Sequence, residues 1–417
     1  MSVAHAIEAT GGAGGAALTR CVSCTADVFA REYWGRAPLL SRAAELRGSF
    51  TDLLDTAAVD ELVSERGLRT PFLRMAKEGA VLNAGTFTRG GGAGATVTDL
   101  AADDKVLAQL GDGATLVLQA LHRSWPPLVE FGSRLADELG HPVQVNAYVT
   151  PPQNQGFAAH YDVHDVFVLQ VSGRKKWTIH APVVDSPLDN QPWDKRKDAV
   201  AARTADEPVI DTVIEPGDAL YLPRGTIHSA AALGETSIHL TVGVHPLTRY
   251  HLVKHLLAAV QEDPALRTSL PVGVDLADPD VLADELSATL AALHRALDAQ
   301  PVAAAAEHVG TNLMQRTRPE ALAPLAQLTA AASLTAATPV RRRAGLRIRV
   351  RRDADGATAL VLLDRTVTVP AAAADAVKTV LTGAAFTPAE LPGLDDDGRL
   401  ALVRRLLRDG VLVPAGS

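Results

Sequence analysis

The sequence is 417 residues long, with 47% hydrophobic residues, 21% charged residues and a net charge of −8. The length predicts two or three domains, and the composition excludes collagen-like, fibrous and intrinsically disordered chains. The negative charge also excludes an overall electrostatic attraction to nucleic acid or to an anionic membrane surface.

The two cysteines, Cys21 and Cys24, are too few for a disulfide framework or for a four-ligand zinc site. Unpaired thiols are typical of the reducing cytoplasm, which is therefore the predicted location. No secretion signal is evident, and no stretch approaches the roughly 18 apolar residues that cross a bilayer. We therefore expect no membrane contact.

Residues 1–17 are small and glycine-rich, which predicts a disordered tail before a folded chain that begins at residue 18. Short helical patterns follow to about residue 110, including 57–66. The sequence then changes to short runs rich in β-branched residues, separated by turn sequences such as Ser172-Gly173. The predicted strands are residues 115–118, 143–150, 165–171, 177–180, 212–214, 219–222 and 236–244. Many short strands with little helix between them predict an antiparallel sandwich or barrel.

Beyond residue 250 the apolar residues return to helical spacing, with predicted helices at about 252–260, 281–297 and 319–332. Alanine-rich helices with an apolar stripe commonly pack against a second copy or a neighbouring domain. From residue 340 a different unit begins, in which Leu346, Ile348 and Val350 alternate with arginines. Its later order of helix (371–381), helix (400–409) and strand (410–413) resembles a small winged-helix module.

The arginines at 341–343, 347, 349 and 351 concentrate positive charge in this last unit. A solvated or intramolecularly paired face is the favoured interpretation, because acidic residues are close in sequence and no aromatic residues are interleaved. A contact with nucleic acid or the ribosome is the second interpretation, which we do not favour.

The motif that carries chemistry is His160-x-Asp162, followed far downstream by His228 in the sequence Pro-Arg-Gly-Thr-Ile-His. Side chains alternate along an extended strand, so His160 and Asp162 should point the same way. A second histidine from a distant strand would complete a set of two imidazoles and one carboxylate, which holds Fe(II) and leaves coordination positions open. His160, Asp162 and His228 are therefore the predicted metal ligands and catalytic centre.

The open positions suit a 2-oxoglutarate co-substrate, whose far carboxylate needs a cation or hydroxyl groups inside the barrel. Lys175 is the candidate cation, because strand alternation sends it to the face opposite Lys176. Ser237, His239 and Thr241 share one face of a strand, where a polar row fits a pocket floor better than an apolar core.

Two nearby residues each have two assignments. Asn146 fits the same pocket or a structural buried amide equally well. For His164, two residues past Asp162, a surface or supporting position is favoured over substrate contact.

These residues resemble the JmjC-type hydroxylases, and within them the ribosomal oxygenase group. The resemblance lies in residues 146–151 (Asn-Ala-Tyr-Val-Thr-Pro), 155–162, 166–177 and 216–228, with Phe29, Tyr33-Trp34 and Pro38-Leu39-Leu40 near the start. It covers about residues 25–250 by motif and the remainder by architecture. The chain departs from the group in its high alanine content and in the glycine-rich run at 90–94.

The resemblance implies an α+β chain of three parts: a JmjC/cupin double-stranded β-helix at 18–248, a helical dimerisation domain at 249–338 and a winged-helix-like domain at 339–417. It implies that His160, Asp162 and His228 bind Fe(II). Lys175 would pair with 2-oxoglutarate, and Asn146, Thr241 and His239 would lie in the same pocket. The expected activity is that of a 2-oxoglutarate-dependent dioxygenase that hydroxylates an Arg or His side chain of a ribosomal protein.

Two other functions are carried as alternatives. One is hydroxylation of a peptide natural product or a free amino acid in biosynthesis. The other is a cupin that binds without catalysis, including a regulator that associates with DNA through the C-terminal module. Lysine demethylation is less favoured, because no chromatin-reading module is visible in the sequence.

Overall fold

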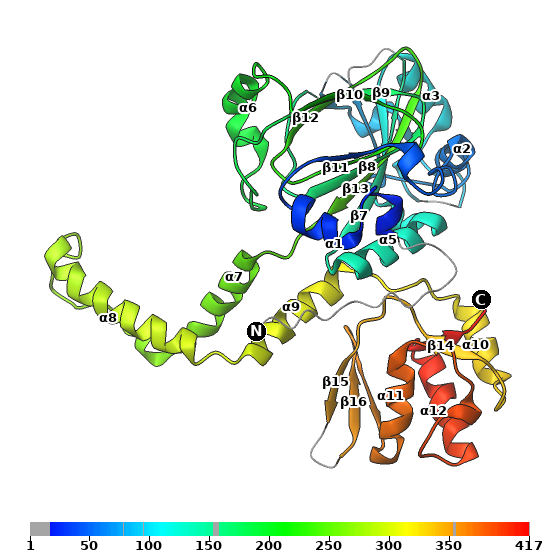
Figure 1. Cartoon of the computed structure of the whole chain (residues 1–417), viewed down its shortest axis with the longest axis vertical. Helices are drawn as coiled ribbons and strands as arrows, with labels where there is room; N and C mark the ends of the chain where they lie inside the picture. The colour runs from blue at the N-terminus through cyan, green and yellow to red at the C-terminus, as the bar shows by residue number, and fades with distance from the viewer. Residues whose placement is uncertain (1–16, 78, 95, 153–157, 353–355, 417) are drawn as a thin grey trace.

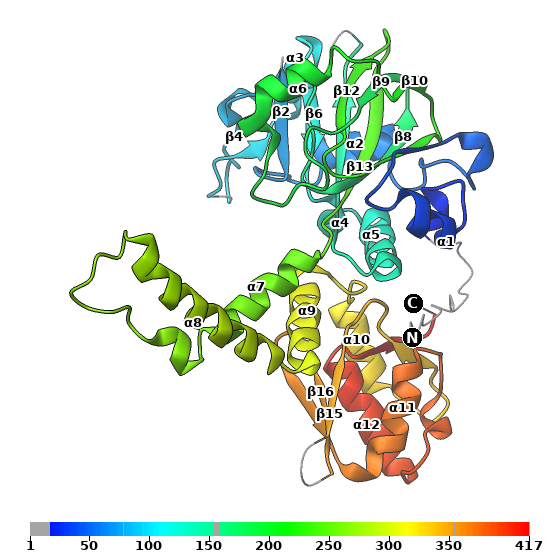
Figure 2. The same ribbon diagram turned by 60° about the vertical axis from the view of Figure 1, so that its left-hand side comes forward.

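The computed structural model describes residues 17–77, 79–94, 96–152, 158–352 and 356–416. A β-rich unit comes first, a helical arm extends from it, and a smaller mixed unit ends the chain (Figures 1 and 2). Residues 1–16 of the predicted tail and part of the 155–162 motif lie outside the described residues. Ala17 is buried, and its N–H donates to Glu138 Oε1 at 2.7 Å.

Two antiparallel sheets form the β-rich unit. The larger has eight strands in the order β1-β11-β8-β13-β7-β6-β2-β3, and the smaller has the order β10-β9-β12. Apolar side chains of β8 in the large sheet pack with those of β9 in the small one, as Val166 and Val168 do with Trp177 and Ile179. The predicted antiparallel sandwich is confirmed for this unit. The bounds of the strands in the two sheets are Leu39–Ser41 (β1), Leu73–Lys77 (β2), Ala80–Val81 (β3), Thr115–Leu118 (β6), Val143–Thr150 (β7), Asp165–Ser172 (β8), Lys175–His180 (β9), Ile210–Ile214 (β10), Ala219–Leu222 (β11), Ile227–Ala232 (β12) and Ser237–Val244 (β13).

The seven predicted strands all occur. Of the other strands in the two sheets, β1, β2 and β3 were not predicted, and neither was β12. Its sequence, Ile-His-Ser-Ala-Ala-Ala, is rich in alanine, which is depleted in strands. Pairing with β9 holds it in place nonetheless, with His228 opposite Ile179. Tertiary context therefore outweighs local preference in the strand that carries the third predicted ligand.

Helices cover one face of the large sheet. The helix α5 (Pro126–Leu139) buries Leu128, Phe131 and Leu135 against it, begins with two prolines and ends at Gly140, which has the left-handed conformation that glycine adopts without strain. The predicted helix at 57–66 is α2 (Thr56–Ser64), which also contributes to this core. The other helices and short strands here are Ala26–Val28 (α1), Asp103–Gly111 (α3), Leu121–Ser124 (α4), Lys197–Arg203 (α6), Thr88–Arg89 (β4) and Leu100–Ala101 (β5).

The helical arm consists of α7 (Arg249–Val260), α8 (Pro279–Asp298) and α9 (Val302–Arg316). The first two match predicted helices, and α9 was not predicted. Several leucines of α8 remain exposed in this chain, with Leu282 at 39%, Leu286 at 54% and Leu290 at 45%. No helix among the described residues is both long and apolar enough to cross a bilayer.

The C-terminal unit has its own apolar core, built on helices α10 (Pro324–Ala332), α11 (Ala374–Thr382) and α12 (Asp396–Arg408). Its strands form two small sheets, β14-β18 and β15-β16-β17. Helix α10 packs against α12, so Ala331 and Leu334 belong to this core. The strand bounds are Val340–Arg342 (β14), Arg349–Arg352 (β15), Thr358–Val361 (β16), Thr366–Val369 (β17) and Leu412–Pro414 (β18).

The predicted basic strand is shorter than its alternation suggested. Leu346 and Ile348 pack on the core ahead of β15, whereas Val350 within β15 is 48% exposed. Arg347 pairs with Asp137 of α5 at 3.4 Å, and Arg349 pairs with Glu307 of α9 at 2.6 Å. These ion pairs agree with an intramolecularly paired face.

Candidate metal centre and its cavities

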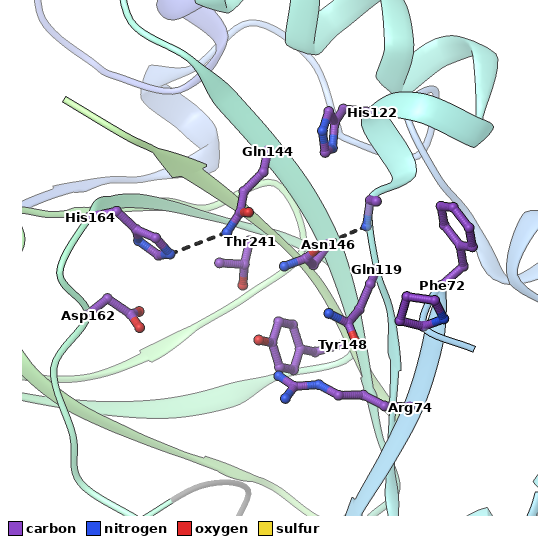
Figure 3. A pocket seen from close by; sticks show the side chains of 12 residues that line it. Phe72, Arg74, Gln119, His122, Gln144, Asn146, Tyr148, Asp162, His164 and Thr241 are labelled. Atoms are coloured by element: carbon purple, nitrogen blue, oxygen red, sulfur yellow. Dashed lines mark hydrogen bonds between the residues drawn. The ribbon is translucent and has the colours of Figure 1, made fainter. Parts of the chain in front are cut away.

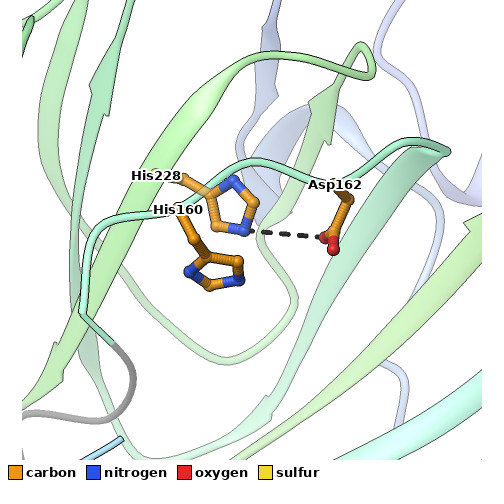
Figure 4. Close-up of side chains that lie close together, drawn as sticks. All are labelled: His160, Asp162 and His228. Carbon is orange, nitrogen blue, oxygen red and sulfur yellow. Dashed lines mark ion pairs between the residues drawn. The ribbon is translucent and has the colours of Figure 1, made fainter. Parts of the chain in front are cut away.

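His160 and His228 come from distant segments that the main chain joins directly. The N–H of His160 donates to the carbonyl of His228 at 3.1 Å, and the N–H of His228 donates to that of His160 at 2.8 Å. Close to these two bonds, the N–H of Gly225 donates to the carbonyl of Asp162 at 2.9 Å. This is a single bridge and not the regular strand expected around His160. It still brings all three predicted ligands together (Figure 4).

One ligand atom from each of His160, Asp162 and His228 lies within 4.8 Å of the others. The imidazole rings are 4.5 Å apart, and His228 Nε2 is 3.8 Å from Asp162 Oδ2. In both histidines Nδ1 faces a main-chain carbonyl, Ala158 O at 2.8 Å and Thr226 O at 3.0 Å. A carbonyl oxygen only accepts, so each Nδ1 carries the hydrogen and each Nε2 keeps a lone pair for a ligand. Two imidazole nitrogens and a carboxylate form a donor set that suits Fe(II).

The charge states fit metal binding as well. Burial, with the neighbouring His160 adding to it, lowers the pKa of His228 to about 4, so the ring is neutral near pH 7. Burial acts to raise the pKa of Asp162, but the surrounding imidazoles, His164 first among them, outweigh it and the pKa is lowered. A neutral imidazole and an ionised carboxylate are the forms that coordinate metals.

A cavity of about 380 Å³ opens beside the three ligands. All three line it, together with four of the predicted pocket residues or their neighbours: Lys175, Trp177, His239 and Thr241. Lys176 is exposed on the opposite face of β9, as strand alternation predicted. Trp193 stands at this cavity too, with its ring 6.0 Å from that of His160.

Lys175 is a buried cation without a buried anion. Lys175 is 3% exposed, and its Nζ donates a hydrogen bond to Thr150 Oγ1 at 3.0 Å. Burial lowers the pKa of Lys175 to about 7. Within the described part of the chain no carboxylate forms an ion pair with it. Two further buried polar atoms nearby, His239 Nδ1 and Trp177 Nε1, have no hydrogen-bond partner among the described residues. Such a group of donors suits an anionic ligand.

The polar row of β13 is paired across the sheet with a second polar row on β7. Ser237 lies opposite Thr150, His239 opposite Tyr148, and Thr241 opposite Asn146. His239 stacks on Tyr148 with ring centroids 5.0 Å apart. Ser237 is not among the residues that line the cavity. Its hydroxyl accepts a hydrogen bond from Gln170 Nε2 at 2.9 Å instead. His239 and Thr241 do line it.

Asn146 lies in an adjoining cavity of about 350 Å³, which Asp162 also lines (Figure 3). Its Oδ1 accepts a hydrogen bond from the N–H of Ala120 at 3.0 Å, which leaves the NH2 group as its donor. Four residues line both cavities: Arg74, Tyr148, Asp162 and Thr241. The second cavity is otherwise lined by Pro71, Phe72, Gln119, Ala120, His122, Gln144 and His164.

His164 is therefore more than a surface residue. It lines the second cavity, and Gln144 Nε2 lies 3.3 Å from its Nε2. Sequence reasoning missed Arg74, Gln119 and Trp193. Arg74 and Gln119 come from outside the residues that carry the motif, and nothing in their own sequence neighbourhood marks them. Tyr148 could have been found, because it alternates with Asn146 on the strand that was predicted correctly.

A buried network supports the segment that leads to His228. The carboxylate of Asp165, in a fully buried residue, accepts hydrogen bonds from the Tyr221 hydroxyl and from the N–H of Arg224, both at 2.9 Å. The N–H of Gly35 in turn donates to Tyr221 Oη at 2.8 Å. Asp165 thus joins the strand that follows Asp162 to the turn that precedes His228.

Comparison with known proteins relates the part of the chain that carries this site to a known domain. Residues 128–252 match the JmjC domain model. The chain is 31% identical to ribosomal oxygenase 1 of Gallus gallus over 253 residues, which are 59% of this chain and 40% of that protein. It is 29% identical to the bifunctional lysine-specific demethylase and histidyl-hydroxylase NO66 of Drosophila mojavensis over 266 residues, 60% of this chain and 28% of that protein. The chain thus spans less than half the length of these two relatives.

Among solved structures, the fold is similar to that of the ribosomal oxygenase YcfD of Escherichia coli. The complex of YcfD with cobalt and succinic acid has a TM-score of 0.54 at 20% identity, covering 95% of this chain and 99% of YcfD. A complex of YcfD with cobalt and 2-oxoglutarate has a TM-score of 0.52 at 18% identity, with coverages of 95% and 99%. The chain therefore carries a JmjC domain at residues 128–252 within a cupin fold, and the resemblance of its motifs to the ribosomal oxygenases is confirmed.

Proposed function

We propose that the chain is an Fe(II)- and 2-oxoglutarate-dependent hydroxylase that acts on a side chain of a ribosomal protein. The observation that carries the proposal is the pair of features in one cavity: a His-Asp-His set whose ligand atoms lie within 4.8 Å of one another, and a buried lysine with no carboxylate partner among the described residues. The complexes of the similarly folded YcfD with cobalt and with 2-oxoglutarate or succinic acid support the same ligands here.

His160, Asp162 and His228 would hold the iron, and Lys175 would bind the far carboxylate of 2-oxoglutarate. The bound iron would supply the oxidising chemistry, in which O2 and 2-oxoglutarate would be converted to the new hydroxyl group, succinate and CO2. The protein fixes the imidazoles through their Nδ1–H bonds to Ala158 and Thr226. The hydroxyl of Thr150 positions the lysine, and the aromatic rings of Trp177 and Tyr148 line the same cavity.

The target side chain would enter the second cavity, which adjoins the first and is also lined by Asp162. Its lining contains three carboxamides, those of Gln119, Gln144 and Asn146. Within the described lining, Asp162 is the one carboxylate, and a bound metal would neutralise it. Arg74 remains as a cation in the wall.

These charges favour a neutral target over a charged one. A guanidinium would meet Arg74 and the metal with no free carboxylate to pair with, which is costly in a buried site. A neutral imidazole can accept from one amide and donate to another. We therefore favour histidine over arginine as the hydroxylated residue.

The rest of the chain completes the proposal. We infer a homodimer formed through the helical domain at 249–338, supported by the exposed leucines of α8, and a winged-helix-like domain at 339–417. The packing of α10 on the C-terminal core favours counting that helix with the last domain. A cytoplasmic location rests on the unpaired Cys21 and Cys24.

Incubation of the protein with intact ribosomes, Fe(II) and 2-oxoglutarate, followed by mass spectrometry of the ribosomal peptides, tests the proposal. We expect one histidine-containing peptide to gain one oxygen atom, with succinate formed in parallel. The variant His160→Ala should give neither product. Succinate formation from 2-oxoglutarate that depends on a free amino acid or a small peptide, with unmodified ribosomal proteins, would overturn the substrate assignment. No succinate under any condition would overturn the enzymatic one.

A further inference from the structure

A groove lined by arginines lies on the C-terminal unit, in a part of the chain distinct from the residues of the metal centre. It has a volume of about 490 Å³ and runs between the start of β17 and the second half of α12. Helix α12 is drawn in red in Figure 1. The groove is lined by Arg365, Thr366, Val367, Ala401, Arg404, Arg405, Arg408 and Asp409.

The charge of this unit is opposite to that of the rest of the chain. Residues 339–417 contain 13 Lys and Arg and 9 Asp and Glu, a net charge of +4 within a chain of −8. The arginines of β14 and β15 are largely engaged, as in the pairs Arg341–Glu320 and Arg349–Glu307. The groove arginines are the second concentration of positive charge.

The groove contains more arginines than carboxylates that could neutralise them. Arg365 binds Asp364 and the carbonyl of Asp409, and Arg405 is 3.7 Å from the Asp409 carboxylate. Arg404 uses only Nε, which donates to Ala331 O at 3.1 Å. Arg408 is exposed and has no hydrogen-bond or ion-pair partner within the described chain. Two carboxylates thus serve four guanidinium groups.

Helix geometry sets the free groups in a row. Arg404 and Arg408 are four residues apart, so they lie on the same face of α12 about 6 Å apart along its axis. The helix dipole attracts basic residues to the last turn of a helix such as α12 and stabilises the helix by about 0.3–1 kcal/mol for each of them. It does not explain why Arg365 of another element converges on the same groove.

The lining selects the kind of anion. Guanidinium groups match phosphate oxygens with paired N–H donors, and the exposed Thr366 hydroxyl adds another donor. Val367 and Ala401 are the apolar residues of the described lining, and no aromatic ring is present to anchor a peptide or to stack on a base. Arg405 also donates a hydrogen bond to the carbonyl of Thr368, on the edge of β17. A peptide strand that paired with this edge would need that carbonyl.

We propose that the groove between β17 and α12 binds the phosphate backbone of a nucleic acid duplex, without sequence preference. Binding then rests on Arg404 and Arg408, with Arg365 and Arg405 alongside. The inference does not depend on hydroxylase activity, because none of these residues lies near the metal centre.

Fluorescence anisotropy of the full chain with a labelled duplex of about 16 base pairs, as RNA or as DNA, tests the proposal. We expect saturable binding that weakens steeply between about 50 and 200 mM KCl. The variant Arg404→Glu/Arg408→Glu should bind at least about tenfold more weakly, with a salt slope smaller by about two. The matched control Arg352→Glu/Lys378→Glu changes the net charge equally at exposed sites outside the groove, and should bind like the original.

Several outcomes decide the matter. Thermal unfolding of both variants confirms that each remains folded. The variant His160→Ala should bind the duplex unchanged, which separates this inference from the proposed hydroxylation. No binding of either duplex would overturn the proposal, as would an equal loss in the control variant. Tighter binding of a polyglutamate peptide than of the duplex would assign the groove to an acidic protein partner instead.

Discussion

The main chains of His160 and His228 exchange two hydrogen bonds, at 3.1 and 2.8 Å, and their imidazole rings lie 4.5 Å apart. The relative position of the two rings is therefore fixed by the backbone before any metal binds. Since both Nδ1 atoms donate to carbonyls, each Nε2 keeps its lone pair, and one ligand atom from each of the three residues lies within 4.8 Å of the others. Preorganisation of this kind lowers the cost of metal binding.

The first prediction concerns metal binding itself. Replacement of His160 by alanine removes one of three ligands, and we expect the affinity for Co(II) to fall by about 100-fold or more. Titration followed by the visible absorption of Co(II) measures it without any turnover. The matched control is His255→Ala, in α7, where the ring stacks on His308 away from the centre. Equal loss of affinity in both variants would contradict the assignment.

The second prediction concerns the proton that 2-oxoglutarate needs. Burial lowers the pKa of Lys175 to about 7, whereas a bound carboxylate requires the ammonium form. Binding at about pH 8 should therefore take up about one proton, and at about pH 6 almost none. Calorimetry of 2-oxoglutarate binding to the Co(II)-loaded protein, in buffers of different ionisation enthalpy, measures the uptake.

Two variants sharpen this test. Lys175→Arg keeps a permanent charge and should abolish the proton uptake, and Lys175→Met should abolish tight binding. In the ligand-free protein the unfolded chain binds more protons between pH 7 and the ordinary lysine pKa. The stability of the original protein relative to that of Lys175→Met should therefore rise as the pH increases through that window. A stability difference that falls across this range would show that Lys175 has an anionic partner.

The third prediction concerns the carboxylate that joins the two ligand-bearing segments. Asp165→Ala leaves the Tyr221 hydroxyl and the Arg224 N–H buried without an acceptor, which should cost about 3 kcal/mol of unfolding free energy. Because Arg224 precedes His228 in the same turn, Co(II) affinity should fall about tenfold as well. Denaturant unfolding and Co(II) titration measure the two effects. The control Asp211→Ala removes an exposed ion pair with Lys176 and should cost less than about 1 kcal/mol.

The fourth prediction concerns the choice of target residue. If Arg74 disfavours a cationic side chain, Arg74→Gln should narrow the preference for a histidine peptide over the matching arginine peptide by about tenfold, about 1.4 kcal/mol. The ratio of kcat/KM values for the two peptides is the measurement. An unchanged ratio would show that the charge of Arg74 does not select the target.

The fifth prediction concerns the helical arm. Leu286→Glu/Leu290→Glu places charges on the exposed apolar face of α8, and we expect a dimer to become a monomer in light scattering. The control Glu285→Lys/Asp284→Lys alters charge on the same helix without changing its leucines. A monomer in the unmodified protein would contradict the proposed dimer outright.

The sequence by itself determined the strand-rich unit and the identity of the three candidate ligands. The strands at 115–118, 143–150 and 219–222 occur with the predicted bounds, because β-branched and apolar runs bounded by turns carry their own signal. Alternation also placed Lys175 and Lys176 on opposite faces of β9.

Only the tertiary structure decided what surrounds those ligands. The strand β12 is alanine-rich and forms because β9 pairs with it. Arg74 on β2 reaches both cavities through the order of strands in the large sheet, a relationship between distant segments that no local pattern encodes. Asn146 and Lys175 likewise line adjoining cavities because they stand on strands of different sheets, β7 and β9. Local propensity acts over a few residues, whereas a binding site is made by contacts between distant segments of the chain, which form only when the sheets close.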